Sequence, residues 1–515
     1  MRKFFLLLLS LFFLSACGSD KTLFKDLPKG PIKHQYIVMA QTQKGVRARG
    51  FKGATPPKTG ISFGVGTKEF KTTSAQDGSF DIEIDLDSKQ PRGDLAFTVN
   101  GRIYYSNYSV KDLSEKLAFA AKKPFSTGLE IDHISLNKSE ALLLSSSAAL
   151  VRAHPVDEHW KLKKAPTKTI FLNPKMSSNL VPRMVARLND YAIVPFFGTS
   201  ELALISLEKN EIISKTRLLD NTGKLYLFEN KPPLTLKNPI QADGRSPAST
   251  TITRSYAHNP ENIHVLDKNT FLVSFVNYYQ AAGTVKGEKA LVGPGIIALI
   301  AIENDSFVTR DIIALPFKNP QYFVAQSNSE VWVSCSGSYH DINSNPAKSD
   351  NAGLVKIVIS AKQKLSVSSQ ITMNNFTPAI PTFIDGKLVV PEAWGNRIAV
   401  LEVSATSLKK EHIKTHSYHR PFALTLAKHW HDDIVFLISA DANLIAYSLK
   451  DGFFPFPFVE PIKLNKDQNK KVVINPAQLF IRDYSETYVP GYNLWALSPV
   501  TNQIYPLDLM EIFGP

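Results

Sequence analysis

Apolar and polar residues alternate along most of the chain with the period of two that is typical of β-strands. The clearest stretch is residues 376–408, which read FTPAIPTFIDGKLVVPEAWGNRIAVLEVSATSL. A proline opens a first apolar run, Asp385-Gly386 turns the chain into a second, and a third alternating run ends in a polar turn. Because Asp-Gly between apolar runs is a strong hairpin signal, this stretch predicts consecutive antiparallel strands.

The same order of elements recurs with a period of roughly 45 to 75 residues, near the range of propeller blades with insertions. Most copies begin at a proline, whose fixed φ and missing N–H suit the first residue of a strand. These entry prolines are Pro182, Pro260, Pro320, Pro378, Pro421 and Pro476. A further copy without the proline spans residues 129–172, with ALLLSSS and AALVRAH as its second and third runs. Four antiparallel strands per copy predict an all-β fold, a seven-bladed β-propeller over residues 126–515.

A smaller β domain is predicted over residues 36–110. The runs ISFGVG, KEFKTTS, FDIEIDL, DLAFTVN and RIYYSNY alternate with period two, and Asp77-Gly78 predicts a hairpin turn. Residues 111–125 have apolar positions at helical spacing and are expected to link the two domains. The domain is interpreted as a small N-terminal β-sandwich.

The first residues have the pattern of an export signal. A basic start is followed by an apolar run over residues 4–14, which is too short to span a membrane as a stable helix. The sequence Leu14-Ser15-Ala16-Cys17 resembles a bacterial lipobox. This resemblance implies a signal peptide over residues 1–16, lipid (palmitate-type) modification of Cys17 and a tether over residues 17–35. Gly18 in place of Asp implies sorting to the outer membrane, with the protein facing the periplasm or the cell surface.

Two family resemblances follow from these motifs. The proline entry, the polar turns and closing runs such as NLIAYSLKDG resemble the YVTN-type, surface-layer-like propellers of secreted bacterial proteins, which fall within the WD40/YVTN repeat-like class. The phrase TTSAQDGSFDIEI resembles the carboxypeptidase-regulatory-like sandwich, which serves as a stalk or spacer. The first resemblance implies architecture and not chemistry, because such propellers include binding modules, lactonases and quinone or haem enzymes.

Charge and cysteine content narrow the range of partners. The chain has 515 residues, a formal net charge of +13 and a pI near 9.3, which favours an acidic protein or an anionic glycan as a partner. Because the sequence predicts export, nucleic acid is not expected to be a partner. Only Cys17 and Cys335 are present and Cys17 is assigned to the lipid anchor, so no intramolecular disulfide is expected. Cys335 within VWVSCSGS is predicted to be a core residue.

Candidate ligand contacts come from the blade entries and the turns between second and third strands, which share one face of a propeller. Long additions are expected on this face at residues 220–259, 277–294 and 334–352. Aromatic and arginine side chains are the usual anchors of an interface. The predicted ligand-binding residues are Tyr278, Tyr279, Tyr339, His340, Asp341, Trp394, Arg397, His419, Arg420, Asp441, Tyr488 and Tyr492.

Motifs for catalysis are missing from the sequence. It has no C-x-x-C-H, H-E-x-x-H, G-x-S-x-G or P-loop pattern. Residues 428–433, KHWHDD, are interpreted as a solvated turn and not as a metal site. The blade-entry residues Asn259, Asn319, Thr377, Arg420 and Asn475 offer amides and a cation in place of a carboxylate cage, so no catalytic residue, metal or cofactor is assigned.

The sequence therefore predicts an envelope lipoprotein whose propeller is a binding or scaffold module for a protein, a glycan or a small ligand. One alternative is a lactonase-like hydrolase that uses a divalent cation at the channel mouth. Another is a subunit of an outer-membrane assembly complex, although such lipoprotein propellers usually have eight blades.

Overall fold

The computed structural model describes a mainly β-stranded chain. It covers residues 37–41, 45–50, 54–65, 68–85, 94–99, 102–109, 124–173, 180–237, 249–280, 291–340, 348–384, 386–393, 395–415, 421–426, 434–439, 443–448, 454–455, 462–463, 478–481, 494–498 and 501–507. Contacts divide the chain into two compact units, Met1–Glu115 with Phe513–Pro515, and Lys116–Ile512. Within the described ranges, no helix combines the length and the apolar character needed to cross a bilayer.

The first unit consists of two antiparallel sheets. One has the order β1-β2-β5 and the other β4-β3-β6-β7. The strands are β1 (Ile37–Gln41), β2 (Gly45–Gly50), β3 (Gly60–Val65), β4 (Lys68–Thr73), β5 (Phe80–Asp85), β6 (Asp94–Val99) and β7 (Arg102–Ser109). All five predicted runs therefore form strands.

The turn at Asp77-Gly78 is present, but it does not close a hairpin. Gly78 has φ +80°, and the Asp77 carboxylate accepts a hydrogen bond from the Ser79 N–H at 3.0 Å. The strands on its two sides, β4 and β5, belong to different sheets, because β4 pairs with β3 and β5 pairs with β2. The hairpin prediction is therefore wrong, since long-range pairing decides which sheet each strand joins.

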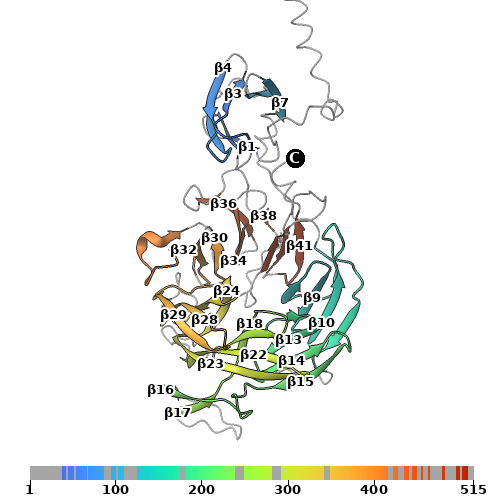
Figure 1. Cartoon of the computed structure of the whole chain (residues 1–515), viewed down its shortest axis with the longest axis vertical. Helices are drawn as coiled ribbons and strands as arrows, with labels where there is room; N and C mark the ends of the chain where they lie inside the picture. The colour runs from blue at the N-terminus through green and yellow to red at the C-terminus, as the bar shows by residue number, and fades with distance from the viewer. Residues whose placement is uncertain are drawn as a thin grey trace, which may run out of the picture. The chain divides into compact units, whose positions relative to one another are not determined.

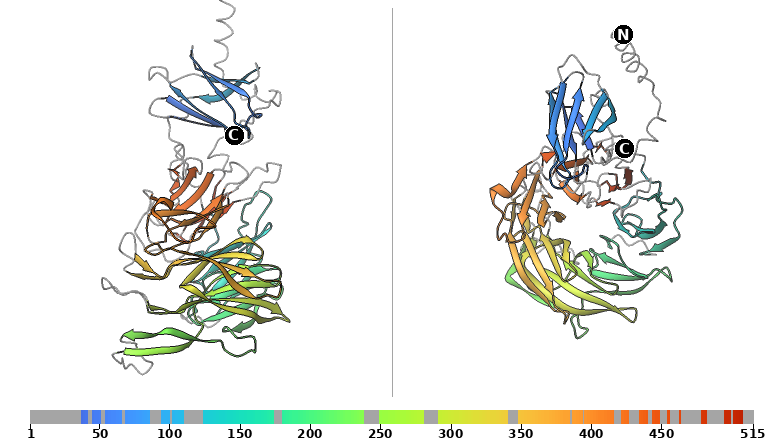
Figure 2. Two further views of the ribbon diagram at one scale, coloured as in Figure 1. Left: turned by 60° about the vertical axis from the view of Figure 1, so that its left-hand side comes forward. Right: turned by 45° about the horizontal axis from the view of Figure 1, so that its top comes forward.

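Six sheets of the second unit have four or more strands and follow one another along the chain. Figure 1 labels some strands of each sheet, and the right-hand view of Figure 2 shows the sheets arranged in a ring. The first three blades are β8 (His133–Leu136), β9 (Glu140–Ser145), β10 (Leu150–Pro155) and β11 (Lys168–Phe171); β12 (Ala186–Leu188), β13 (Tyr191–Phe196), β14 (Glu201–Ser206) and β15 (Glu211–Thr216); and β18 (Pro260–Val265), β19 (Thr270–Phe275), β22 (Pro294–Glu303) and β23 (Ser306–Lys318).

The next three blades repeat this order. They are β24 (Pro320–Ser327), β25 (Glu330–Cys335), β28 (Gly353–Ile359) and β29 (Leu365–Thr372); β30 (Thr382–Ile384), β31 (Lys387–Pro391), β32 (Arg397–Glu402) and β33 (Ile413–Thr415); and β34 (Pro421–Leu426), β35 (Ile434–Ser439), β36 (Asn443–Ser448) and β37 (Phe454–Pro455), with β38 (Ile462–Lys463) also on β36. A short 3-10 turn, η3 (Lys410–His412), precedes β33. Successive first strands contact one another, so they surround the axis of the ring.

The prediction of seven blades is corrected by the last repeat. It forms a three-stranded sheet of β39 (Gln478–Ile481), β40 (Leu494–Leu497) and β41 (Ile504–Leu507), which leaves six blades of four or more strands. The run TYVPGYN was predicted to be the second strand, but β39 pairs directly with β40, from Gln478 opposite Leu497 to Ile481 opposite Leu494. TYVPGYN itself lies outside the described residues.

The residues before blade 1 bind the edge of this last sheet. The Phe125 N–H donates to the Ile504 carbonyl at 2.9 Å, and the Ile131 N–H donates to the Asn502 carbonyl at 2.6 Å. The Gln478 side chain also accepts a hydrogen bond from the Ile134 N–H at 2.7 Å. Both edges of the three-stranded sheet are thus tied to the start of the propeller, and these contacts close the ring.

Most of the described core lies between successive sheets. Buried clusters join blade 1 to blade 2, blade 2 to blade 3, blade 3 to blade 4 and blade 4 to blade 5, and a further cluster joins the last sheet to blade 1. Cys335 is fully buried at the end of β25, and burial raises the pKa of its thiol. Its prediction as a core residue is confirmed.

Candidate functional site

The blade entries and the second-to-third-strand turns meet on one face, as the blade pattern predicts. Asn259, with φ +55°, precedes the entry proline of blade 3. Its Oδ1 accepts a hydrogen bond from the Tyr278 N–H at 3.0 Å, and its Nδ2 donates to the Phe197 carbonyl of blade 2 at 2.9 Å. Asn319 repeats the geometry with φ +55° and donates to Ser336 Oγ at 2.6 Å. These amides therefore stabilise the loops of the face.

The three predicted additions each form a hairpin on this scaffold. They are β16 (Leu227–Lys237) with β17 (Ser249–Tyr256), β20 (Tyr278–Gln280) with β21 (Leu291–Val292), and β26 (Ser338–His340) with β27 (Lys348–Asp350). The first two pack together. Tyr279 lies with its ring edge-on to His258 at 4.6 Å between centroids, and its hydroxyl is 3.4 Å from Asn230 Nδ2.

One face of β16 packs onto the propeller. Phe228 and Asn230 are buried, and Tyr226, just before the strand, packs against the core that joins blades 2 and 3. Burial lowers the pKa of His258, whose Nδ1 lies 2.9 Å from the Tyr256 carbonyl. The base of the hairpin is therefore held in a fixed position.

At the base of the hairpin, the opposite face is apolar and open to solvent. Leu225 and Leu227 alternate with the buried positions and are 40% and 51% exposed. Tyr256 lies directly opposite Leu227 in the strand register and is 45% exposed. We call these three residues the hairpin patch. A β-strand that is apolar on both faces can bury only one of them against its own core, so the hairpin patch has the character of an interaction surface.

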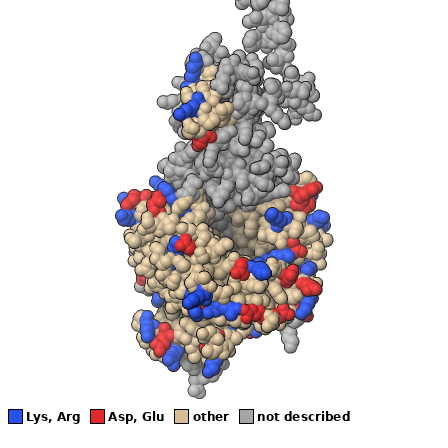
Figure 3. Space-filling model, in the orientation of Figure 1, with Lys and Arg blue, Asp and Glu red and all other residues tan. Residues whose placement is uncertain are grey.

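Charged residues border the hairpin patch along the strands. Glu229 lies opposite Arg254, with a 3.3 Å ion pair, and Lys231 forms a second ion pair with Glu229 at 3.0 Å. Hydrogen bonding from Lys231, together with Arg254, lowers the pKa of Glu229. An apolar centre beside a polar rim is the usual anatomy of a protein interface. Figure 3 shows charges of both signs mixed over the visible face.

The structure places three of the predicted ligand contacts. Tyr278 and Tyr279 are half-buried beside the hairpin base. Arg397 begins β32, where its guanidinium is paired with Glu392. Tyr339 and His340 belong to β26, although their side chains lie outside the described part. The remaining predictions outside the described residues are Cys17, Asp341, Trp394, His419, Arg420, Asp441, Tyr488 and Tyr492.

A second polar group lies on the first strands and entries of blades 2 to 4. Arg183 Nε is 3.3 Å from Glu261 Oε2, and the guanidinium lies 4.4 Å from the centroid of the Phe197 ring. Burial raises the pKa of Glu261, although Arg183 opposes this effect. Burial also raises the pKa of Tyr322. Across the described residues, no three His, Cys, Asp or Glu side chains come together as a metal site.

Sequence reasoning found the additions but missed the hairpin patch. The phrase LYLFEN carried a signal, because its apolar residues Leu225, Tyr226, Leu227 and Phe228 alternate between exposed and less exposed positions at the start of β16.

No family model and no curated protein matches the chain. Among solved structures, Hsv2 of Kluyveromyces lactis is similar over 72% of this chain and 90% of its own, with 8% identity and a TM-score of 0.37. The designed protein Ika8 is similar over 75% and 99%, with 6% identity and a TM-score of 0.40. A candidate 6-phosphogluconolactonase from Bacteroides fragilis is similar over 79% and 95%, with 8% identity and a TM-score of 0.42. Similarity at this level does not indicate an activity. The propeller fold is established by the order and pairing of the strands.

Proposed function

We propose that this chain is a lipid-anchored envelope protein whose propeller recognises a protein partner through the hairpin patch. The observation that carries the proposal is that the start of β16 has apolar residues on both faces. Phe228 is buried against the propeller, while Leu227 and Tyr256 face solvent side by side. A flat aliphatic and aromatic surface suits another protein better than a sugar, because sugar hydroxyls need hydrogen-bonding partners.

The charge of the chain supports an acidic partner. The formal net charge is +13, and beside the hairpin patch two cations, Lys231 and Arg254, share one anion, Glu229. Opposite charge around an apolar centre accelerates association and selects partners. We therefore expect an envelope protein with an exposed apolar patch that carries acidic residues at its rim.

The anchoring part of the proposal rests on the sequence. The lipobox-like LSAC supports lipidation of Cys17 and an outer-membrane location. The β1–β7 unit then acts as a spacer of the carboxypeptidase-regulatory-like sandwich type. The propeller belongs, in this proposal, to the YVTN-type class of secreted proteins.

The test is site-specific photo-crosslinking from position 256 in intact cells of the source organism. A crosslinked protein that is lost in a Leu227→Ser background supports recognition through the hairpin patch. Crosslinking to the same proteins from Phe171, which is 63% exposed on β11 of blade 1, would show that contact is non-specific.

A second candidate function is hydrolysis on the first strands of the propeller, where Glu261 Oε2 lies 3.3 Å from Arg183 Nε and burial raises the pKa of the Glu261 carboxyl. A carboxyl group with a raised pKa is suited to general acid–base chemistry. In that case the purified protein hydrolyses a lactone, and Glu261→Gln lowers the rate by about 10²-fold or more. Leu227→Ser leaves such a rate unchanged, so the two functions are separated by the two variants.

A further inference from the structure

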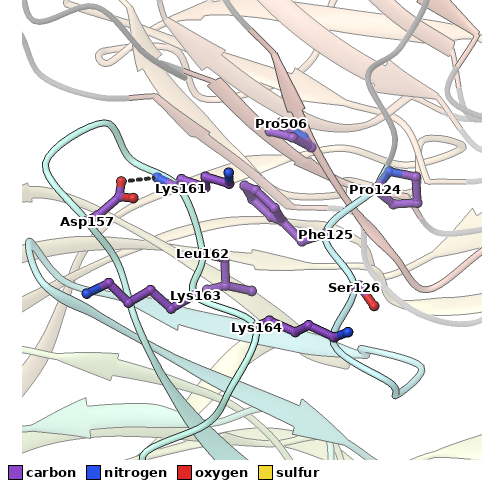
Figure 4. A pocket seen from close by; sticks show the side chains of 9 residues that line it. All are labelled: Pro124, Phe125, Ser126, Asp157, Lys161, Leu162, Lys163, Lys164 and Pro506. Atoms are coloured by element: carbon purple, nitrogen blue, oxygen red, sulfur yellow. Dashed lines mark hydrogen bonds between the residues drawn. The ribbon is translucent and has the colours of Figure 1, made fainter.

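A pocket lies where the ring of blades closes, away from the hairpin patch in the sequence. Its volume is about 530 Å³, within the range of small-molecule sites. Residues 124–126 form one wall, the connection from Asp157 to Lys164 between β10 and β11 forms another, and Pro506 of β41 completes the lining. Figure 4 shows these side chains together.

The base of the pocket is apolar and rigid. Phe125 and Leu162 line it. Leu162 belongs to the buried cluster between the last sheet and blade 1, and Phe125 packs against that cluster. Behind them, Trp495 packs edge-on against Phe125 at 5.1 Å and lies 5.3 Å from the Trp160 ring, between centroids. The Trp495 Nε1–H donates to the Trp160 carbonyl at 3.0 Å. An apolar ligand group can therefore bury its surface on a base that is already ordered.

The acidic residue of the pocket lining, Asp157, is hydrogen-bonded to backbone groups of its own loop. Asp157 Oδ1 accepts hydrogen bonds from the His159 N–H at 3.0 Å and the Lys161 N–H at 2.9 Å. This double contact fixes the turn that begins the connection to β11. Its carboxylate is thus directed at backbone donors and away from the lysine ammonium groups.

Three exposed lysines line the pocket, and their directions differ. Lys161 extends toward Phe125, Lys164 extends toward Ser126, and Lys163 points away from both (Figure 4). No acidic side chain in the described part of the chain forms an ion pair with any of the three. Two ammonium groups therefore flank an apolar base.

We propose that this pocket binds a phosphate monoester attached to an apolar chain or ring. Lysine binds phosphate as a point charge, and all basic residues of the lining are lysines. A phosphate monoester carries between one and two negative charges near neutral pH, which matches two ammonium groups. The apolar part of the ligand lies on Phe125 and Leu162.

The probes are decyl phosphate, decanol and inorganic phosphate, titrated into the full chain and followed by tryptophan fluorescence and calorimetry. Decyl phosphate is expected to bind, and both other probes at least about tenfold more weakly, because each lacks one half of the recognised chemistry. If decanol bound as tightly as decyl phosphate, the pocket would be only an apolar groove that does not recognise phosphate. If inorganic phosphate bound as tightly as decyl phosphate, surface charge alone would account for binding. Either result, or no binding of decyl phosphate, overturns the proposal.

The matched variants are Lys161→Ala with Lys164→Ala, and Lys163→Ala alone. All three lysines are exposed, so the fold is retained. The double variant is expected to bind decyl phosphate at least about tenfold more weakly, with a smaller dependence on salt. Lys163→Ala is expected to bind as the wild type does. An equal loss per charge in the two variants would mean that general attraction, and not the pocket, holds the ligand.

Discussion

Arg397 and Glu392 form a two-point ion pair in which the carboxylate side chain is fully buried. Arg397 Nε lies 2.8 Å from Glu392 Oε2, and its Nη2 donates to Oε1 of the same carboxylate. The Nη2 also donates to the Asn375 carbonyl at 2.5 Å. The Arg397 Nε and Nη2 groups thus bind other residues of the propeller, which gives the residue a structural role, and its contact with a ligand stays a prediction.

We predict that Arg397→Ala lowers the free energy of unfolding by about 3–5 kcal/mol, because it leaves the Glu392 carboxylate buried without its partner. The control is Lys387→Ala, which removes an exposed pair with Glu402 at 3.1 Å and is expected to cost under about 1 kcal/mol. Urea unfolding of both variants measures the difference. Equal, small losses would show that the buried pair contributes no more than an exposed one.

Acid is predicted to weaken the closure of the ring through His133. Its Nε2 lies 3.0 Å from Gln478 Nε2 of the last sheet, and burial lowers its pKa to about 3 from the ordinary 6.5. The unfolded chain takes up this proton below pH 6.5 while the folded chain resists it. The stability that depends on a neutral His133 is therefore fully present above pH 6.5. It is lost progressively as the pH falls toward 3.

The measurement is the urea midpoint at about pH 7 and about pH 4 for wild type and His133→Gln. We expect the midpoint to drop less in the variant, because glutamine takes up no proton. His258 and His264 also have pKa values lowered by burial, so part of the drop remains. His159→Gln, on an exposed turn, should follow the wild type. Identical drops in wild type and His133→Gln would contradict the assignment.

Cys17→Ser is predicted to release the protein from the membrane fraction, because it removes the residue that is proposed to carry the lipid. Incorporation of labelled palmitate should be lost at the same time. Cys335→Ser is the matched control, since that thiol is buried in the core. If the Cys17→Ser protein stayed in the membrane fraction, the prediction that the chain is a lipoprotein would be contradicted.

The strands and turns were predictable wherever the signal is local. Short apolar runs bounded by turn residues define β13, β19, β25 and β31, which are buried at nearly every position. The glycine of Asp385-Gly386 has the positive φ, +75°, that a tight hairpin requires. Pro260, Pro320 and Pro421 each begin a strand, as predicted. These features depend on the chain's own neighbouring residues, so the sequence alone indicates them.

Features that depend on distant partners were not predictable. The last repeat has three strands because β39 pairs directly with β40, and Phe125, just before the first blade, binds the free edge of β41. The hairpin patch escaped prediction for a related reason. Leu227 and Phe228 have the same apolar character in sequence, and only packing on the propeller determines which of them is buried.

The central claim is that the hairpin patch recognises a protein, and crosslinking from position 256 tests it most directly. A photoreactive residue at Tyr256 is expected to capture one envelope protein in intact cells, and Leu227→Ser should reduce the yield by about tenfold through loss of buried apolar area. The same probe at Phe171 of blade 1 should capture none of it. Capture of that protein at equal yield from both positions, or from 256 despite Leu227→Ser, would contradict recognition at the hairpin patch.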